Sequence, residues 1–244
     1  MKDWPYPRWI AHRGAGKLAP ENTLAAFRLG ATHGFRMFEC DVKLGADNIP
    51  FLLHDDKLDR TTNGIGTAGD HTWDQLGWLD AGSWHSRMYA GEPIPAFENI
   101  ARWCLANKYF LDIEIKPSRG REAETGDVVA RHAARLWEGQ PVPPFLTSFQ
   151  PESLRAAQLA APQLPRGLLL DKPHERWLEG ARELECVAIV CNHKLWTAET
   201  VRQAKQAGFR CLSYTVNEPA EAERLFALGT DGIVTDRVDL FPPG

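Results

Sequence analysis

The chain has 244 residues, of which 43% are hydrophobic and 25% are charged, and its formal net charge is −4. A chain of this length and composition is an ordinary globular protein that buries a substantial core, so neither disulfides nor a structural metal are needed for stability. The small negative charge gives no general attraction for nucleic acid or for an anionic membrane. An anionic substrate must therefore be held by local positive groups or by a bound cation.

The cysteines form neither a CxxC pair nor a zinc-type cluster. Most of them lie in apolar runs, where a cysteine behaves as a small buried hydrophobe, and this favours a reducing compartment. The N-terminal residues lack an apolar signal core, and no window approaches the roughly 20 apolar residues that span a bilayer. We therefore expect a cytoplasmic protein with no membrane insertion and no nucleic-acid partner. The five cysteines are Cys40, Cys104, Cys186, Cys191 and Cys211.

Short β-like runs alternate with amphipathic helical stretches along the chain. A strand at residues 9–11 is followed by a helix from Asn22 or Thr23 to about His33, and then by strands at 37–44 and 49–54. Later strands are predicted at 109–116, 144–149, 167–171, 187–191, 211–216 and 232–235, with helices notably at 122–137, 151–160, 197–207 and 219–228. About eight such units predict an α/β fold, a TIM (β/α)8 barrel, with residues 1–244 forming one domain.

One stretch, from Asp56 to Pro95, breaks this alternation. It is rich in Gly, Asp, Thr and Trp, shows no sustained helical period, and contains the tight-turn pair Asn63-Gly64. Loops of this length inside a compact domain usually carry a function. We therefore expect residues 56–95 to be a functional insertion within the barrel domain.

Two of the predicted strands carry one charged face. Side chains two apart along a strand point the same way, so Glu39 lies beside Asp41, and Glu114 lies beside Lys116. Taken alone, either strand could be half exposed and antiparallel, with its charges in solvent. In a barrel, however, the apolar face packs against the outer helices. The charged face then points inward, near the strand ends where barrel active sites lie.

Carboxylates buried close together need a compensating positive charge. A hard divalent cation with oxygen ligands, Mg²⁺ or Ca²⁺, suits Glu39, Asp41 and Glu114 better than zinc does. Two histidines, His12 and His54, each follow or end a predicted strand. Because histidine titrates near neutrality, this pair can supply one general base and one general acid. We expect the other six histidines to be structural.

Ordered motifs along nearly the whole chain resemble the glycerophosphodiester phosphodiesterase family. The resemblance begins at His-Arg-Gly (12–14), Pro-Glu-Asn-Thr (20–23) and Glu-Cys-Asp-Val (39–42). It continues through His-Asp (54–55), Leu-Asp-Arg-Thr-Thr-Asn-Gly (58–64), Leu-Asp-Ala-Gly-Ser-Trp (79–84) and Asp-Ile-Glu-Ile-Lys (112–116). The last motifs are Ser-Phe (148–149), Tyr-Thr-Val-Asn (214–217) and Thr-Asp (235–236). The short length is similar to that of the cytoplasmic bacterial members.

The resemblance implies a role for each matching residue. The family's metal ligands match Glu39, Asp41 and Glu114, and its acid–base histidines match His12 and His54. Its phosphate-binding positions match Arg13 and Lys116, and substrate contacts are implied for Phe149 and Tyr214, where many relatives carry Trp at the latter position. Residues 56–95 resemble the family's capping insertion beside the glycerol site.

The resemblance also implies a reaction: cation-dependent hydrolysis of small glycerophosphodiesters, such as glycerophosphocholine and glycerophosphoethanolamine. The products would be sn-glycerol 3-phosphate and an alcohol, formed through a cyclic phosphate. Two alternatives stay open. One is a lysophospholipase D-like or phospholipase C-like enzyme acting on lipids, and the other is an inactive barrel that only binds phosphodiesters. The preferred alcohol and the oligomeric state are not predicted.

Overall fold

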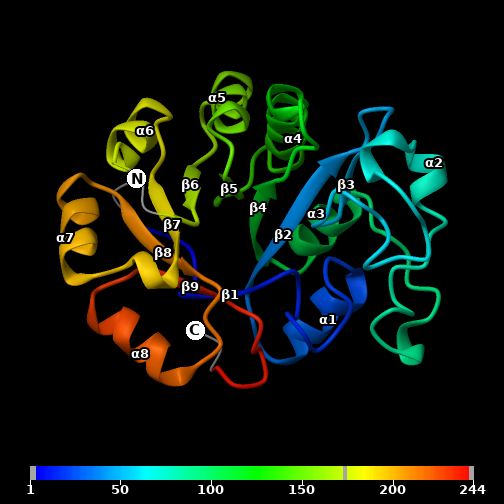
Figure 1. Cartoon of the computed structure of the whole chain (residues 1–244), viewed down its shortest axis with the longest axis horizontal. Helices are drawn as coiled ribbons and strands as arrows, with labels where there is room; N and C mark the ends of the chain where they lie inside the picture. The colour runs from blue at the N-terminus through cyan, green and yellow to red at the C-terminus, as the bar shows by residue number, and fades with distance from the viewer. Residues whose placement is uncertain (1–3, 173–174, 242–244) are drawn as a thin grey trace.

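Eight parallel strands close into a barrel that is surrounded by helices (Figure 1). The structure, a computed structural model, describes residues 4–172 and 175–241. The strands follow one another around the barrel in the order β1-β9-β8-β7-β6-β5-β4-β2, and β1 pairs with β2 to close it. This confirms the predicted TIM barrel. The strands are β1 (Trp9–Ala11), β2 (Met37–Leu44), β4 (Phe110–Ile115), β5 (Phe145–Ser148), β6 (Arg166–Leu170), β7 (Ala188–Asn192), β8 (Arg210–Tyr214) and β9 (Gly232–Thr235).

Helices pack on the outside of the barrel between successive strands. They are α1 (Leu24–Thr32), α3 (Phe97–Ala106), α4 (Glu122–Leu136), α5 (Pro151–Ala160), α6 (Trp177–Glu183), α7 (Ala198–Gln206) and α8 (Pro219–Ala227). The sequence predicts helices between the strands but gives no bounds for two of these, α3 and α6. Ala96 at the start of α3 has no side-chain oxygen to cap the helix, and α6 has only 7 residues, so both lack the usual sequence markers. Among the described residues, no helix is long and apolar enough to cross a membrane.

The predicted strand at residues 49–54 is shorter than expected and lies outside the barrel. The strand β3 (Pro50–Leu52) pairs antiparallel with the end of β2, so the two form a hairpin. The backbone N–H of Leu53 donates to the carbonyl of Asp41 over 3.1 Å. The hairpin therefore returns the chain to the barrel mouth and leaves His54 beside Asp41, although His54 does not end a barrel strand.

The insertion at residues 56–95 lies beside β2, β3 and α1 (Figure 1). As predicted, it holds no long helix: its elements are η1 (Ala68–Asp70), α2 (Trp73–Leu76) and η2 (Arg87–Tyr89). It has a small apolar core of its own, shared with the β3 hairpin, and this core fixes it to the end of β2. The buried members of that core are Phe51, Leu53, Leu58, Ala68, Leu76, Ala81 and Ile94.

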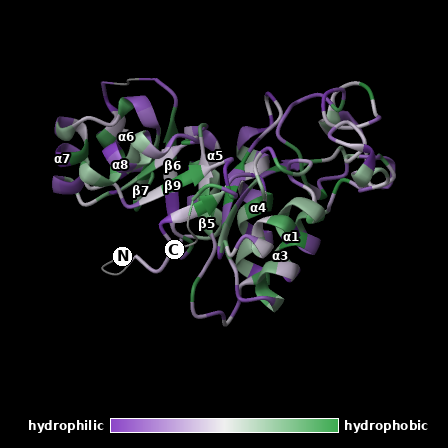
Figure 2. Cartoon of the chain, turned by 90° about the horizontal axis from the view of Figure 1, so that it is seen from below, coloured by the Kyte–Doolittle hydropathy of each residue, from purple (hydrophilic) through white to green (hydrophobic). Residues whose placement is uncertain are grey.

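The strands of the barrel are buried on both faces. On β2 the residues Phe38, Cys40 and Val42 belong to the outer apolar core, which lies between the strands and the helices. A separate apolar cluster fills the lower part of the barrel interior, where β5 is coloured hydrophobic in Figure 2. All five cysteines are free and buried, as predicted. The apolar stripe of β2 thus faces outward, which turns its charged stripe into the barrel.

A buried arginine joins two backbone segments near the start of β6. Arg166 is 2% exposed, and its guanidinium donates to the carbonyls of Leu164 (2.8 Å), Leu184 (3.2 Å) and Pro162 (3.4 Å). Arg166→Met should lower the free energy of unfolding by about 1–3 kcal/mol, because it leaves buried carbonyls without donors. Urea denaturation measures this change. The exposed Arg131→Met on α4 is the control and should leave stability nearly unchanged, so equal losses in the two variants would contradict the prediction.

Candidate active site

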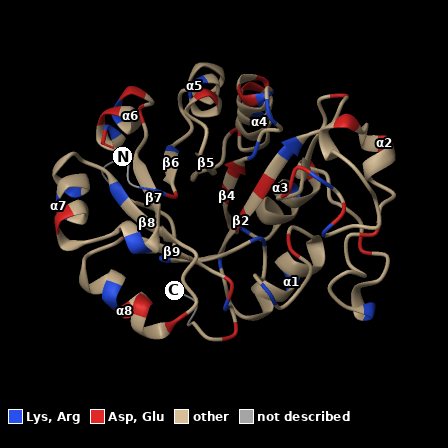
Figure 3. Ribbon diagram, viewed as in Figure 1, with Lys and Arg blue, Asp and Glu red and all other residues tan. Residues whose placement is uncertain are grey.

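The paired strands β2 and β4 stack charged side chains inside the barrel. Their register places Glu39 opposite Asp112, and Asp41 opposite Glu114. Side chains two apart share a face, so the carboxylates form two layers above the apolar floor. Lys43 of β2 and Lys116, which directly follows β4, form the next layer toward the strand ends. Figure 3 shows this order along β2 as red segments followed by a blue tip.

Three of these carboxylates converge: Glu39, Asp41 and Glu114 offer oxygen atoms that all lie within 4.8 Å of one another. Burial, and then repulsion from Asp41, raises the pKa of Glu39 well above its usual range and that of Glu114 to about 7. Burial alone would also raise the pKa of Asp41, but the nearby Arg13 and Lys116 hold it well below its usual range. Burial of these three carboxyl groups together therefore disfavours their full ionisation unless further positive charge compensates.

The trio fits a hard divalent cation. Among the described residues, the buried Oε1 atom of Glu39 has no hydrogen-bond partner. A buried acceptor without a donor is costly, and three neighbouring carboxylates repel one another. An oxygen-only donor set is the kind that Mg²⁺ and Ca²⁺ prefer.

The loop after β1 brings positive charge to the trio. Arg13 has a positive φ of 50°, and its backbone N–H donates to Glu39 Oε2 over 3.0 Å. Its Nε atom lies 3.1 Å from Asp41 Oδ2. On the opposite side, Lys116 Nζ lies 2.8 Å from Glu114 Oε1 and 3.3 Å from Asp41 Oδ1. Two positively charged side chains thus flank the carboxylates.

The carboxylate of Asp236, the residue that follows β9, contacts His12. Its Nδ1 atom lies 2.6 Å from Asp236 Oδ1, and its Nε2 atom lies 3.8 Å from Glu39 Oε2. Burial alone would raise the pKa of Asp236, but the hydrogen bond from His12 lowers it to about 2. The loop after β1 can approach Asp236 this closely only because residue 16 is a glycine (φ 58°): a Cβ atom there would lie 2.1 Å from the Cα of Asp236. The pair directs the other ring nitrogen of His12 toward the trio.

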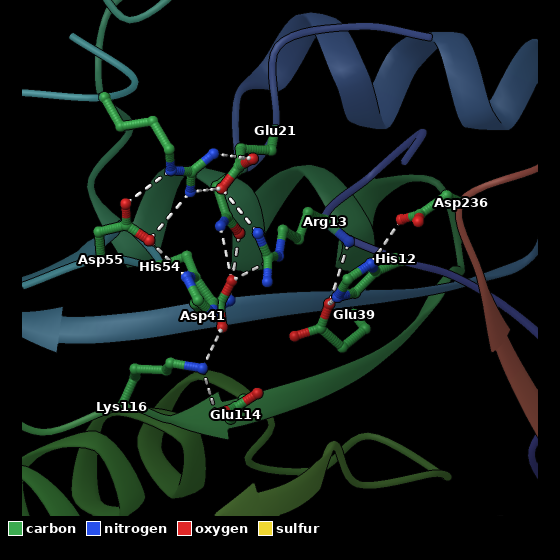
Figure 4. A network of polar contacts seen from close by, with 12 residues as sticks. His12, Arg13, Glu21, Glu39, Asp41, His54, Asp55, Glu114, Lys116 and Asp236 are labelled. Carbon is green, nitrogen blue, oxygen red and sulfur yellow. Dashed lines mark hydrogen bonds and ion pairs between the residues drawn. The ribbon is translucent and has the colours of Figure 1, made fainter. Parts of the chain in front are cut away.

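His54 has a similar carboxylate partner on the other side of the site. Its Nδ1 atom lies 2.6 Å from Asp55 Oδ1 (Figure 4). Burial lowers the pKa of His54, and the positive charges of Arg13 and Lys116 lower it further, against the opposing effect of Asp41. These effects together favour the uncharged form of the His54 ring.

These residues line one cavity of about 180 Å³ at the barrel mouth, which includes His12, His54, Arg13, Glu39, Glu114, Lys116, Phe149 and Tyr214. The rings of Phe149 and Tyr214 meet edge to face, with their centroids 5.6 Å apart, and Lys116 Nζ lies 5.7 Å from the Phe149 centroid. Asp41 lies directly behind the cavity, paired with Arg13 and Lys116. The structure thus gathers all the residues that the sequence placed in the site.

The comparisons with known proteins agree with this geometry. The model of the glycerophosphoryl diester phosphodiesterase family matches residues 12–240. The chain belongs to this family. It is 34% identical to the Bacillus subtilis protein YhdW over 238 residues, 94% of each chain. It is 32% identical to the glycerophosphodiester phosphodiesterase of Caldanaerobacter subterraneus over 231 residues, 93% of each chain.

A solved structure extends the comparison to a bound product. An Oleispira antarctica phosphodiesterase in complex with the product sn-glycerol-3-phosphate superposes with a TM-score of 0.88 and 32% identity, covering 94% of this chain and 93% of that chain. The protein is therefore an enzyme of the glycerophosphodiester phosphodiesterase class. The family generally depends on a divalent cation, and the acidic trio is a possible place for one.

Several residues of this family member's site had no predicted role. Asp236 and Asp55 hold the two histidines, and the side chain of Asn22 both donates to Asp41 Oδ2 (2.8 Å) and accepts from its backbone N–H (3.1 Å). Asp112, whose pKa burial raises to about 8, accepts a hydrogen bond from Thr147 over 2.9 Å. Asn22, Asp55, Asp112 and Asp236 stand in the family motifs, but a motif does not show which side chain each of them contacts. Of the histidines expected to be structural, His33, His71, His85, His132 and His193 do not line the cavity, and His174 lies outside the described residues.

Proposed function

We propose that this enzyme hydrolyses small glycerophosphodiesters, such as glycerophosphocholine and glycerophosphoethanolamine, to sn-glycerol 3-phosphate and an alcohol. One observation carries the proposal: two carboxylate-bound histidines, His12 and His54, line the same cavity as the acidic trio. A base and an acid are thus available on either side of one phosphate position. The product named for the Oleispira antarctica relative supports the same reaction here.

In this proposal Glu39, Asp41 and Glu114 hold Mg²⁺ or Ca²⁺. When bound, the cation supplies positive charge that polarises a phosphoryl oxygen and stabilises the transition state. Arg13 and Lys116 bind the phosphate oxygens from either side of the trio, and the fork of an arginine suits two such oxygens at once. Their fixed positions mean that little reorganisation is needed as charge develops.

The histidines move the protons in two steps. One histidine takes the proton of the substrate's glycerol 2-hydroxyl as that oxygen forms a bond to phosphorus. The bond from phosphorus to the alcohol oxygen breaks, and the other histidine protonates this oxygen. Water then attacks the cyclic glycerol phosphate, with the histidines exchanging roles, and the ring opens to release the 2-hydroxyl. Asp236 and Asp55 keep both rings in one orientation throughout.

The two sides of the cavity serve different parts of the substrate. Phe149 and Tyr214, on the β5 and β8 side, contact the departing alcohol. Residues 56–95 cap the glycerol side, within a single barrel domain that spans residues 1–244. With the alcohol on one side of the cavity and the glycerol on the other, the reacting phosphate would lie between His12 and His54.

Phosphorus NMR of glycerophosphocholine with chelator-treated enzyme tests the proposed function. We expect no reaction until Mg²⁺ or Ca²⁺ is added, and then the appearance of glycerol 3-phosphate, with a transient cyclic phosphate signal. The site supports this expectation, because three carboxylates face only two positively charged side chains, Arg13 and Lys116. Folded enzyme that gives no product with either cation would refute the proposal.

A lipid substrate is the second candidate. The insertion exposes large apolar side chains, since Trp78 is 90%, Met88 84% and Ile65 80% exposed. Exposed apolar side chains of this size favour contact with a lipid surface. Faster turnover of lysophospholipid micelles than of glycerophosphocholine would support this candidate, and the reverse ratio would exclude it as the main activity.

A further inference from the structure

Arg60, in the insertion, binds two carboxylates at once (Figure 4). Its Nε and Nη2 atoms donate to Asp55 Oδ2 (2.6 Å) and Oδ1 (3.0 Å). Its Nη1 and Nη2 atoms donate to Glu21 Oε2 (2.8 Å) and Oε1 (2.7 Å). Only the planar fork of an arginine makes two such bidentate contacts together. The distance between the two carboxylates is thus set by one rigid group.

Each of these carboxylates also holds a residue of the site. Asp55 Oδ1 lies 2.6 Å from His54 Nδ1, and Glu21 Oε1 accepts a hydrogen bond from Arg13 Nη1 over 2.8 Å. Arg13 in turn contacts Asp41. The result is one chain of alternating charge that runs from the histidine to the acidic trio: His54, Asp55, Arg60, Glu21, Arg13 and Asp41.

We propose that Arg60 is a positioning residue for the reaction, which fixes the orientations of His54 and Arg13 together. This inference rests on the roles proposed above for those two residues. His54 follows a short hairpin strand outside the barrel, so the barrel ladder does not fix its ring. Asp55 is itself partly exposed, and Arg60 is the group that keeps its carboxylate from turning toward water. A loosely held base or phosphate ligand lowers the rate of the chemical step.

The insertion has further contacts with the rest of the chain, so Arg60 is not needed to keep it in place. Glu92 Oε1 accepts a hydrogen bond from the backbone N–H of Ala25 over 2.9 Å, and His85 Nε2 lies 3.0 Å from the carbonyl of Lys17. The apolar core under the insertion adds to these contacts. An Arg60 variant should therefore fold, and its defect should appear in turnover rather than in stability.

Arg60→Met tests this inference, with kcat and KM measured for glycerophosphocholine at saturating Mg²⁺. We expect kcat to fall roughly 10–100-fold, the usual loss when a residue that orients a site ligand is removed, with a smaller change in KM. Arg60→Lys should recover only part of this loss, because an ammonium cannot bridge both carboxylates in the same geometry. Guanidinium ion added to Arg60→Ala should restore part of the rate.

The matched control is Arg102→Met, which removes an exposed arginine–carboxylate pair, Arg102 with Glu98, on α3. It should leave kcat unchanged and should not respond to guanidinium, since exposed pairs contribute little. Thermal unfolding of every variant separates a positioning role from loss of fold. An Arg60→Met enzyme with kcat within about twofold of the parent, or a loss explained by its unfolded fraction, would overturn the inference.

Combining Arg60→Met with His54→Ala tests whether Arg60 affects kcat through His54. In His54→Ala, the added Arg60→Met change should cost several-fold less than it costs in the parent enzyme, because part of its target is gone. Equal losses in the two backgrounds would overturn the link to His54. A parent enzyme that does not release glycerol 3-phosphate would refute the proposed function and this inference together. An active parent enzyme together with an Arg60→Met variant of unchanged kcat would refute this inference alone.

Discussion

Replacing either His12 or His54 by alanine should lower kcat by roughly 10²–10⁴-fold, the usual contribution of a general acid–base group. Each ring has its Nδ1 atom 2.6 Å from a carboxylate oxygen, so Nε2 is the atom expected to take or give a proton at the substrate. KM should change little, because neither histidine is expected to bind the phosphate strongly in the ground state. Steady-state release of glycerol 3-phosphate from glycerophosphocholine measures both constants.

A histidine outside the cavity gives the control for this experiment. His132 lies on α4, so His132→Ala should keep the parent's kcat. Asp236→Asn should reproduce a large part of the His12→Ala loss, because the amide no longer favours the required orientation of the ring. Near-normal turnover in a folded His12→Ala or His54→Ala enzyme would show that the histidine in question does not transfer protons.

Removal of the divalent cation should abolish turnover, and Glu39→Gln should raise the cation concentration needed to restore it. Glu39 contributes a buried oxygen atom with no other partner, and its amide replacement binds a hard cation less strongly. Activity titrated against free Mg²⁺ and Ca²⁺ measures this requirement. Glu98→Gln, on the exposed face of α3, is the matched control and should leave the titration unchanged.

Binding can also be measured without turnover. Mg²⁺ should raise the unfolding temperature of the parent enzyme, because a ligand that binds only the folded state stabilises it, and this shift should shrink in Glu39→Gln. Protons compete with the cation for groups whose pKa is raised, such as Glu114 at about 7. Apparent affinity should therefore increase as the pH rises through 7. An identical shift in both proteins would exclude Glu39 as a ligand.

The barrel and its acidic trio were predictable because both follow from local repetition. Alternate side chains of a strand point to the same face, so the sequences of β2 and β4 alone indicate which of their residues share the interior face. The position of β3 was not predictable in the same way. A short apolar run has the same appearance in a barrel strand as in an appended hairpin, and only the turn at residues 45–49 and the pairing with β2 decide between them.

Several partners of the site residues were not predictable because they are distant in sequence. Asp236 meets His12 across 224 positions, and Arg60 meets Glu21 across 39. An isolated carboxylate or arginine in a loop is indistinguishable in sequence from one that is solvated on the surface. The family motifs contain these residues, but only the folded chain shows which of them touch.

The β2–β3 hairpin divides the site between two separately packed parts. His12 and the trio belong to the barrel, whereas His54 follows β3 and adjoins the small apolar core of the insertion. Residues 45–95 therefore form a cassette that carries one histidine, its carboxylate and Arg60 together. A chimera that exchanges this cassette for that of a relative replaces His54, Asp55 and Arg60 in a single piece, and it leaves the barrel's own residues untouched.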